Sequence, residues 1–394
     1  MISFDEALAL VEANARPVGS ETLPLGKSAG RVLATAVRAG IDSPRADVSS
    51  MDGYAVATGA DVSVGARFEM AGEAFPGTTP LPALQSKQCV RIFTGAPLPM
   101  DADRVIIQED VDRTDASIVV RVAQGESRFV RRRASDFAEG DDLLAARTFL
   151  TPRALVTAAA ADCGEVDCFI RPRIALLATG DELRAAGVTG SATSIPESLS
   201  VGLAAFGEAW GGEVASVHRE PDDLAHLQQV AAGLVEAHDL LVVTGGASVG
   251  ERDFGKAMFE PLGLDLIFSK VAIRPGKPVW FGRVGMTLIL GLPGNPTSAM
   301  VTARLFLAPL LAGMTGQNAR DAVQWEQVEL TAPLKPCDGR ESFSRARRDG
   351  DRARPFDNQD SGAQATLAAA DWLLRQRPNT PALNIGDRVE ALAF

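Results

Sequence analysis

The sequence predicts a multidomain α/β plus β protein, and three observations support this fold class. The chain has 394 residues, which is enough for several domains. Residues 171–318 alternate strand-like apolar runs with helical patterns, as in a parallel sheet that carries helices on both faces. Residues 45–140 instead show short β-prone runs between Gly, Pro and Asp, which predicts an inserted, mostly β domain.

A split helical N-terminal domain is expected on either side of the inserted domain, from residues 1–44 and 141–170. Its first helix begins at a capping box that starts with Ser3. A second helix is predicted over Lys27–Ala39, and a third over the alanine-rich segment Thr151–Ala161. The first two helices are too few to form a core alone, so we expect the third to pack with them.

Two regions of the chain read as β structure. In the inserted domain the predicted strands are Arg67–Met70, Cys89–Thr94, Arg104–Gln108 and Ser117–Val122. Two intervening loops, Ser49–Ala55 and Thr94–Pro99, fit either a functional site or ordinary turn chemistry. Residues 319–394 predict a C-terminal small β domain, with strands at Gln327–Leu330 and Arg388–Leu392.

The α/β domain places three unusual loops where a parallel sheet binds ligands. Its predicted strands are Ile174–Ala178, Val214–His218, Leu240–Val243 and Thr287–Leu290. Its predicted helices are Ser198–Trp210, one capped by Asp222, and Thr297–Ala312, which Pro309 is expected to kink or shorten. Carboxyl ends of parallel strands share one edge, and ligands bind there. We therefore expect Thr179–Glu182, Gly245–Asp253 and Gly291–Ser298 to share one rim.

Composition argues against several function classes. The net charge of -11 disfavours binding to nucleic acid. The four cysteines form no CxxC pair and the three histidines are scattered, so reduced thiols are expected and a zinc site is not. The N-terminus is too polar for a signal peptide, and no uninterrupted apolar run is long enough to span a membrane. We expect a cytoplasmic protein with no membrane partner.

Charged side chains near the rim suit a phosphorylated ligand and a hard metal ion. The carboxylates are Asp181, Glu182 and Asp253, and the cations are Lys270, Arg274 and Lys277. Carboxylate oxygens are ligands that Mg²⁺ prefers, and Arg and Lys bind oxyanions. Ser248 and Ser298 are further hydrogen-bond donors. Glu182 or Asp253 taken alone fits a carboxylate at a helix N-terminus better than a ligand site, but the clustering of the carboxylates favours a site.

Common catalytic motifs do not account for this pattern. The sequence contains neither GxxxxGK[ST] nor GxGxxG, which disfavours P-loop ATPases and dinucleotide-dependent dehydrogenases. Residues 246–250 spell Gly-x-Ser-x-Gly, but every histidine precedes Ser248, whereas an α/β-hydrolase needs its histidine afterwards. Metal-assisted phosphoryl or nucleotidyl chemistry is therefore the best-supported class.

Six motifs, in order, give the chain a resemblance to a known family. They are Pro44-x-x-Asp47-x-Ser49-x-Met51-Asp52-Gly53-Tyr54-Ala55, Arg91–Pro97, Thr179–Leu183, Gly245-Gly246-x-Ser248-Val249-Gly250-Glu251-x-Asp253, Arg274–Pro278 and Gly291-Leu292-Pro293-Gly294-Asn295-Pro296-x-Ser298. Each motif alone is weak. The ordered set covers essentially the whole chain and closely resembles the MoeA/gephyrin family, the molybdopterin molybdenumtransferases.

The resemblance implies an activity and an assembly. Members of the family insert molybdenum from molybdate into adenylylated molybdopterin and release AMP with a divalent cation, usually Mg²⁺. The α/β domain would bind molybdopterin. The family forms an elongated homodimer in which the site lies between the α/β domain of one copy and the inserted β domain of the other. Other proteins of molybdenum cofactor biosynthesis are further expected partners.

The resemblance also implies roles for individual residues. Those with catalytic roles are Asp52, Thr94, Asp136, Glu182 and Asp253, of which Glu182 and Asp253 would also hold the metal. Those that bind substrate are Gly245, Gly246, Ser248, Lys270, Arg274, Lys277, Pro293, Pro296 and Ser298. Asp52 and Thr94 would face the site from the partner chain, and the two prolines would shape the loop that receives the pterin end.

Several departures from the family pattern leave other readings open. Leu199 follows Glu197-Ser198 where the family often has Asn, Ala134 replaces a Gly, and the register of Glu220-Pro221 is unclear. Arg274 stands where Lys is common. The alternatives are a non-catalytic or weakly active pterin-binding scaffold, and a molybdopterin adenylyltransferase. Molybdate versus tungstate, the exact metal ligands and the final cofactor form are not decided by the sequence.

Overall fold

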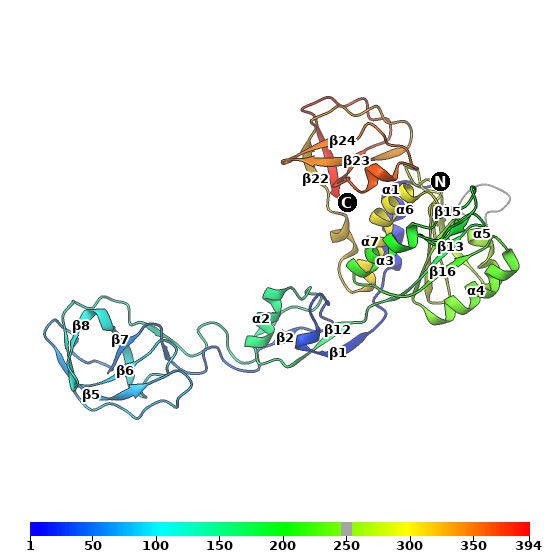
Figure 1. Ribbon diagram of the computed structural model, residues 1–394. Helices are drawn as coiled ribbons and strands as arrows, with labels where there is room; N and C mark the ends of the chain where they lie inside the picture. The colour runs from blue at the N-terminus through cyan, green and yellow to red at the C-terminus, as the bar shows by residue number, and fades with distance from the viewer. Residues whose placement is uncertain (246–253) are drawn as a thin grey trace.

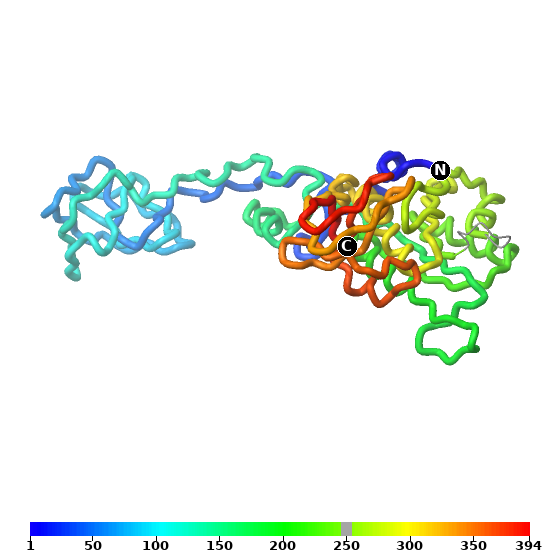
Figure 2. Tube along the Cα trace, turned by 90° about the horizontal axis from the view of Figure 1, so that it is seen from above, coloured from blue at the N-terminus to red at the C-terminus, as the bar shows by residue number. Residues whose placement is uncertain are grey.

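The molecule is elongated, with a body at one end and a β domain at the other (Figures 1 and 2). The computed structural model describes residues 1–245 and 254–394. The body contains the α/β sheet and the C-terminal β sheet. A narrow middle section, with helix α2 (Pro152–Ala160), joins the body to the inserted β domain. The fold class is confirmed as multidomain α/β plus β.

The central sheet of the body has six strands in the order β16-β13-β17-β21-β20-β18. Their bounds are β13 (Arg173–Thr179), β16 (Glu213–Glu220), β17 (Leu240–Thr244), β18 (Asp265–Ser269), β20 (Trp280–Val284) and β21 (Thr287–Leu292). The first four in the spatial order are parallel, as predicted. The expectation of a wholly parallel sheet is wrong for β20, which runs antiparallel to β21 and β18. Val284 pairs with Thr287 across a two-residue turn that only antiparallel strands can use.

Strict alternation along the strands gives the sheet two apolar faces. Leu240 and Val242 face one core, and Leu241 and Val243 face the other. The first core is covered by helices α1 (Phe4–Asn14), α3 (Leu199–Ala209), α6 (Pro296–Thr302) and α7 (Ala308–Met314). The second is covered by α4 (Leu224–Ala237) and α5 (Phe254–Ala257). Asp223 caps α4, so the sequence placed that cap one residue early, at Asp222.

One long helical run crosses the first core. Between α6 and α7 the residues Ala303–Leu307 form a π-helical segment, and Pro309 lies in the first turn of α7. Proline has no backbone N–H, so it cannot donate a helical hydrogen bond. The π-helical turn before it accommodates this missing bond without ending the helical run. Residues Pro296–Met314 are long and apolar enough to span a membrane, with a mean hydropathy of 1.4, but 94% of that window is buried inside the body. This is a core helix.

The inserted domain is a six-stranded sheet in the order β7-β4-β6-β5-β9-β8. The strands are β4 (Gly53–Ala57), β5 (Arg67–Ala74), β6 (Gln88–Ile92), β7 (Ala102–Ile107), β8 (Val111–Arg113) and β9 (Ser117–Val120). All four predicted strands are present. The predicted loop Ser49–Ala55 is partly wrong, because its second half begins β4. Tyr54 is 2% exposed and belongs to the core.

The middle section is less helical than predicted. Helix α1 has the predicted capping box, and α2 begins at its cap Thr151. The helix predicted over Lys27–Ala39 is wrong. Gly30 has a left-handed φ of +71°, and the chain then runs extended as Leu33 bridges to Cys168. The section is instead held by the strand pairs β1 (Ser20–Pro24) with β12 (Glu165–Phe169), β2 (Val37–Arg38) with β11 (Asp142–Leu144), and β3 (Val48–Ser49) with β10 (Val130–Arg131).

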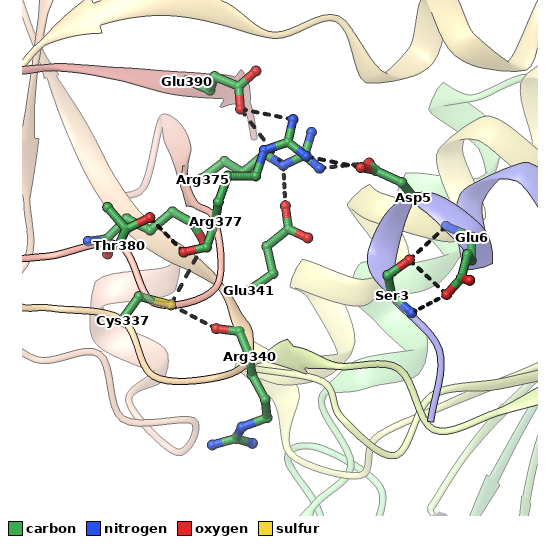
Figure 3. A network of polar contacts seen from close by, with 11 residues as sticks. Ser3, Asp5, Glu6, Cys337, Arg340, Glu341, Arg375, Arg377, Thr380 and Glu390 are labelled. Carbon is green, nitrogen blue, oxygen red and sulfur yellow. Dashed lines mark hydrogen bonds and ion pairs between the residues drawn. The ribbon is translucent and has the colours of Figure 1, made fainter.

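The C-terminal sheet is attached to the body through helix α1 and strand β19. Its order is β19-β23-β25-β26-β22, with β24 beside β23. The bounds are β19 (Ile273–Arg274), β22 (Glu326–Glu329), β23 (Glu341–Asp349), β24 (Arg352–Pro355), β25 (Trp372–Gln376) and β26 (Arg388–Ala393). Arg375 lies between Glu341 and Asp5, so it ties this sheet to α1 (Figure 3). Helix α1 therefore packs with the body, although the sequence assigned it to the split domain.

Candidate functional site

A pocket of about 870 Å³ lies along the carboxyl edge of the parallel strands. Each predicted rim loop contributes to it through described residues: Thr179, Gly180 and Glu182 after β13, Thr244 and Gly245 at the end of β17, and Pro293, Gly294, Asn295 and Pro296 after β21. Strands β13 and β17 are adjacent although β16 lies between them in sequence. The pocket thus opens at the point where the strand order reverses, the usual ligand site of such sheets.

Sheet topology also explains why two lysines reach this edge. Strand β18 runs parallel to β21, because both are antiparallel to β20. Lys270 follows the end of β18 and Lys277 precedes the start of β20, so both lie at the rim and line the pocket. The amide of Val271 donates to the carbonyl of Lys277 at 3.0 Å, which holds the two segments together. Neither ammonium has an ion-pair partner within residues 1–245 and 254–394.

The backbone at Lys270 is strained in a way that often marks functional positions. Its φ is +68°, in the left-handed region that residues other than Gly, Asn and Asp rarely adopt. Such a conformation costs on the order of 1–3 kcal/mol and persists only when surrounding contacts enforce it. Here the amide of Lys270 donates to Val279 at 3.0 Å, and its carbonyl accepts from Ile2. These two backbone hydrogen bonds, with Val279 and Ile2, hold Lys270 at the pocket.

The floor of the pocket is packed closely around Gly245. Its φ is +89°, and a Cβ atom there would lie 2.4 Å from the carbonyl oxygen of Thr179. The Cβ position of Gly294 is 3.6 Å from the Cα of Gly245, so the ends of β13, β17 and β21 meet at this residue. The hydroxyl of Thr179 is buried here and has no hydrogen-bond partner among the described residues. This unsatisfied oxygen is enclosed in the floor of the pocket.

Replacing Gly245 with Ala is expected to destabilise the protein by about 1–3 kcal/mol, because the positive φ is unfavourable and the methyl group meets a backbone oxygen. Urea unfolding measures the change. Gly263→Ala is the matched control: its φ is +80°, but a Cβ there has nothing within 4 Å. Equal losses of free energy in the two variants would contradict the close packing at Gly245.

Carboxylates occupy the other side of the pocket. Glu182 and Asp222 line it, and the exposed Glu182 carboxylate has no hydrogen-bond donor among the described residues. Glu197 also lines it, but its Oε1 accepts the amides of Leu199 and Ser200 at 2.8 and 2.9 Å and so caps α3. No group of three or more metal-ligating side chains exists in the part of the chain that the structure describes. This donor set suits Mg²⁺, which binds through one or two carboxylates plus water and phosphate oxygens.

Asp52 and Thr94 lie together, but not at this pocket. Asp52 Oδ1 accepts both the amide and the hydroxyl of Thr94 at 2.8 Å. The backbone and side-chain hydrogen bonds from Thr94 hold the pKa of Asp52 below its ordinary value of 3.8. The pair sits where β4 begins and β6 ends, in the inserted domain at the far end of the molecule from the central sheet (Figures 1 and 2). Within one chain it cannot touch a ligand in the pocket.

Thr94→Val is expected to raise the pKa of Asp52 part of the way towards 3.8, because the hydroxyl is lost while the amide remains. Carboxylates with a lowered folded pKa stabilise the protein above their unfolded pKa, and this contribution disappears as pH falls through the folded pKa. The variant should therefore lose that stabilisation at a higher pH. An NMR titration of the wild type and of the variant measures the pKa of Asp52 in each protein. Asp61, whose pKa is lowered by hydrogen bonds from Ser63, is the internal control. An unchanged Asp52 titration would contradict the hydroxyl contact.

The remaining predicted residues divide into three groups. Arg274 does not line the pocket with the lysines; it lines a separate cavity of about 160 Å³ against the C-terminal domain. Ser298 is 5% exposed inside α6, and Asp136 is exposed beside the link to the inserted domain. Gly246, Ser248 and Asp253 lie outside the described residues.

One pocket residue, Gln364, was not predicted from the sequence, and two others were named there without a role in the site. Gln364 comes from helix α8 (Gln364–Leu367) of the C-terminal domain, and only tertiary structure brings it to the rim. Leu199 presents an apolar side chain where the family often has an amide. Thr179 is the last residue of the buried strand β13, and this position places it at the rim.

Comparisons with known proteins agree along the whole chain. Residues 2–162 match the MoeA N-terminal region (domain I and II), residues 175–313 a probable molybdopterin binding domain, and residues 327–394 the MoeA C-terminal region (domain IV). A molybdopterin molybdenumtransferase of Haemophilus influenzae is 34% identical over 352 residues, 88% of this chain and 85% of that protein. One from Synechococcus elongatus is 33% identical over 95% of both chains.

A solved structure supports the same assignment. The molybdopterin biosynthesis MoeA protein of Pyrococcus horikoshii superposes with a TM-score of 0.86 at 27% identity, covering 100% of this chain and 99% of that one. Fold, domain order and sequence therefore agree from one end of the chain to the other. The protein belongs to the MoeA family of molybdopterin molybdenumtransferases.

Proposed function

We propose that this protein is a transferase of molybdenum cofactor biosynthesis, which inserts molybdenum from molybdate into adenylylated molybdopterin and releases AMP. The observation that carries the proposal is the convergence of the three rim loops with Lys270 and Lys277 around one pocket, in a chain of this family. The proposed place of action is the cytoplasm, beside other proteins of the same biosynthesis.

The pocket supplies two kinds of charge at separate places. Lys270 and Lys277 lie beyond β21 on the β18 side, while Glu182 and Asp222 lie on the β13 and β16 side. The two ammonium groups would hold the anionic oxygens of molybdate or of a substrate phosphate, because no described carboxylate neutralises them. The segment Pro293–Pro296 would receive the pterin end. The substrate would thus lie across the strand edge in one orientation.

Magnesium fits the acidic side of this pocket. Glu182 would hold the ion, together with Asp253, which lies outside the described residues. A bound Mg²⁺ would neutralise negative charge on the pyrophosphate linkage of adenylylated molybdopterin. Glu182 would orient the ion at the acidic side of the pocket, and Thr179 would form part of the floor beneath the ligand.

A second copy of the chain would complete the site. The half-buried Asp52 and the exposed Thr94 belong to the inserted domain at the far end of the molecule, so they reach a pocket only if the pocket belongs to another copy. A two-fold homodimer would place two such pairs against two pockets. Asp52 is held ionised by Thr94 and would contribute a fixed negative charge opposite the lysines. Arg274, Asp136 and Ser298 stay proposed participants whose contacts with substrate depend on this assembly.

The direct test is AMP release from adenylylated molybdopterin by the purified protein with Mg²⁺, measured with and without molybdate. The expected result is release that depends on molybdate. Release of pyrophosphate from ATP and molybdopterin would instead identify an adenylyltransferase. Tight retention of the substrate without AMP release would identify a binding scaffold, the reading that Leu199 favours. Either of these two results would overturn the proposal.

A further inference from the structure

The last wall of the pocket comes from the C-terminal domain. The segment 356–371 leaves β24, passes the start of α6 and returns to β25. Gln364 lies within it and lines the pocket with an exposed side chain. The side-chain amide of Asn295 donates to the hydroxyl of Ser361 at 3.1 Å, so this segment docks directly against the rim of the central sheet. We call residues 356–371 the docking loop.

One buried guanidinium holds the docking loop. Arg345 lies on β23 and is 1% exposed. Its Nη1 donates to the carbonyl of Ala363 at 3.1 Å and the hydroxyl of Thr366 at 2.7 Å, and its Nη2 donates to the carbonyls of Asn358 at 3.3 Å and Asp360 at 2.9 Å. The fixed, forked geometry of Arg satisfies all four acceptors together, which the single ammonium of a lysine cannot do.

The docking loop is held by polar contacts rather than by apolar burial. None of its residues is buried, and α8 contributes no side chain to any core. Burial of apolar side chains is the usual source of local stability, so here polar contacts must supply it. The Gln359 side chain exchanges two hydrogen bonds with the backbone of Arg345, at 2.9 and 2.8 Å, and the Thr297 hydroxyl donates to the carbonyl of Ala363 at 3.3 Å. Further hydrogen bonds lie within the loop, such as the Gly362 amide to Asp360 at 2.7 Å. Among the described residues of β23, it is the Arg345 side chain that reaches Ala363 and Thr366, on either side of Gln364.

We propose that Arg345 is a positioning residue that sets Gln364 against the pterin end of the substrate, and that Gln364 reads the hydrogen-bonding edge of the pterin ring. The inference rests on the proposed function. Gln364 lines the pocket beside the rim segment that contains Asn295 and Pro296, the segment proposed above to receive the pterin end. Its amide carries a donor and an acceptor side by side, which match adjacent acceptor and donor atoms on a pterin edge.

This arrangement gives the C-terminal domain a role in substrate selection. A site built to hydrogen-bond a polar edge discriminates against analogues that lack it, because its own polar groups are then left unpaired. The lysines would hold oxyanions, and an ammonium group has donors but no acceptor, so it cannot match both the donor and the acceptor atoms of the ring edge. Discrimination between a pterin and another phosphorylated ring system would therefore depend on Gln364, and on Arg345 through it.

The test compares steady-state AMP release in Gln364→Ala, Arg345→Met and the control Arg347→Met. Arg347 lies two residues along β23, is exposed and has no side-chain partner among the described residues. Gln364→Ala and Arg345→Met are each expected to raise KM for adenylylated molybdopterin about tenfold with kcat nearly unchanged, in line with the loss of one or two hydrogen bonds. Arg347→Met should match the wild type. Wild-type KM in Gln364→Ala would overturn the proposal.

A double variant separates positioning from general damage. If Arg345 acts through Gln364, Arg345→Met should add little to KM in a Gln364→Ala background. Hydrogen exchange at the Gln364 amide, which donates to Gly362 at 3.0 Å, should speed up in Arg345→Met and not in Arg347→Met. Fully additive effects, or unchanged exchange, would contradict the positioning role. Arg345→Lys keeps the charge, and its KM and its exchange rate at the Gln364 amide should lie between those of the wild type and Arg345→Met. If Arg345→Met fails to fold, Arg345→Lys still tests the positioning role.

The same assays distinguish this inference from the proposed function. If the wild type releases no AMP, the proposed function fails, whereas exchange at the Gln364 amide still reports whether Arg345 orders the docking loop. If the wild type is active and all three variants match it in KM, the proposed function stands and the role of Gln364 is rejected.

Discussion

Lys277→Ala is expected to reduce molybdate-dependent AMP release by roughly a hundredfold or more, as removal of one preorganised electrostatic group commonly does. Lys277 and Lys270 approach the same rim from two strands, and neither is neutralised by a described carboxylate. The alanine variant leaves one ammonium to hold an oxyanion that two would share. Lys277 is the better choice of the two, because Lys270 also occupies a left-handed backbone conformation that a substitution would disturb.

A charge-preserving variant and a distant lysine sharpen this test. Lys277→Arg should retain part of the activity, since charge is kept while the geometry of contact changes. Lys27→Ala removes an exposed lysine from the middle section and should leave AMP release unchanged. Wild-type turnover in Lys277→Ala, measured at saturating and limiting molybdate, would remove this lysine from the site.

Arg375→Met is expected to lower the free energy of unfolding by about 3–5 kcal/mol, because it leaves Glu341 buried without its partner. The Arg375 and Glu341 side chains are 4% and 5% exposed and form a direct ion pair. The guanidinium also lies 4.9 Å from the centres of the Phe4 and Trp325 rings. Figure 3 shows how Arg375 points from the C-terminal sheet towards Asp5 of helix α1.

Urea unfolding of three variants tests the source of this effect. Arg377→Met removes the neighbouring, 54% exposed arginine that also contacts Asp5, and should cost less than about 1 kcal/mol. The double variant Arg375→Met with Glu341→Gln should recover part of the loss, because no unpaired charge stays buried. A loss below about 1 kcal/mol in Arg375→Met would contradict a structural role for this pair.

The pH dependence of this junction follows from Asp5. Burial raises the pKa of Asp5, but hydrogen bonds and charge from Arg375 and Arg377 outweigh that effect, so its pKa lies below the ordinary value. Its contribution to stability is present above the unfolded pKa and is lost as pH falls through the folded pKa. Acid should therefore loosen the contact between α1 and the C-terminal sheet.

Local patterns predicted the central sheet well because its signals are strong and short-range. Buried strands such as Leu240–Thr244 are continuous apolar runs, and each ends at a glycine turn. The shared rim followed from topology alone. Strand β20 was missed because Gly282 and Arg283 interrupt its apolar run, and only pairing with β21 defines it.

Tertiary contacts decided the rest. Leu33 and Val37 are spaced as on a helix face, yet bridges to distant segments hold this stretch extended. Arg274 was grouped with the lysines by proximity in sequence, but it pairs through β19 with the C-terminal sheet and turns to another cavity. Gln364 could not be found, since no local pattern tells a loop residue that it will meet a rim some 70 residues earlier in the chain.

A subunit-mixing experiment tests most directly whether the site is shared between copies. Asp52→Asn and Lys277→Ala homodimers are each expected to be inactive, because every site lacks one group. After subunit exchange, each mixed dimer has one site with both groups intact and one with neither. Random exchange should therefore restore about a quarter of wild-type AMP release, as two-fold symmetry requires. A mixture that forms mixed dimers by native mass spectrometry yet regains no activity would contradict the shared site.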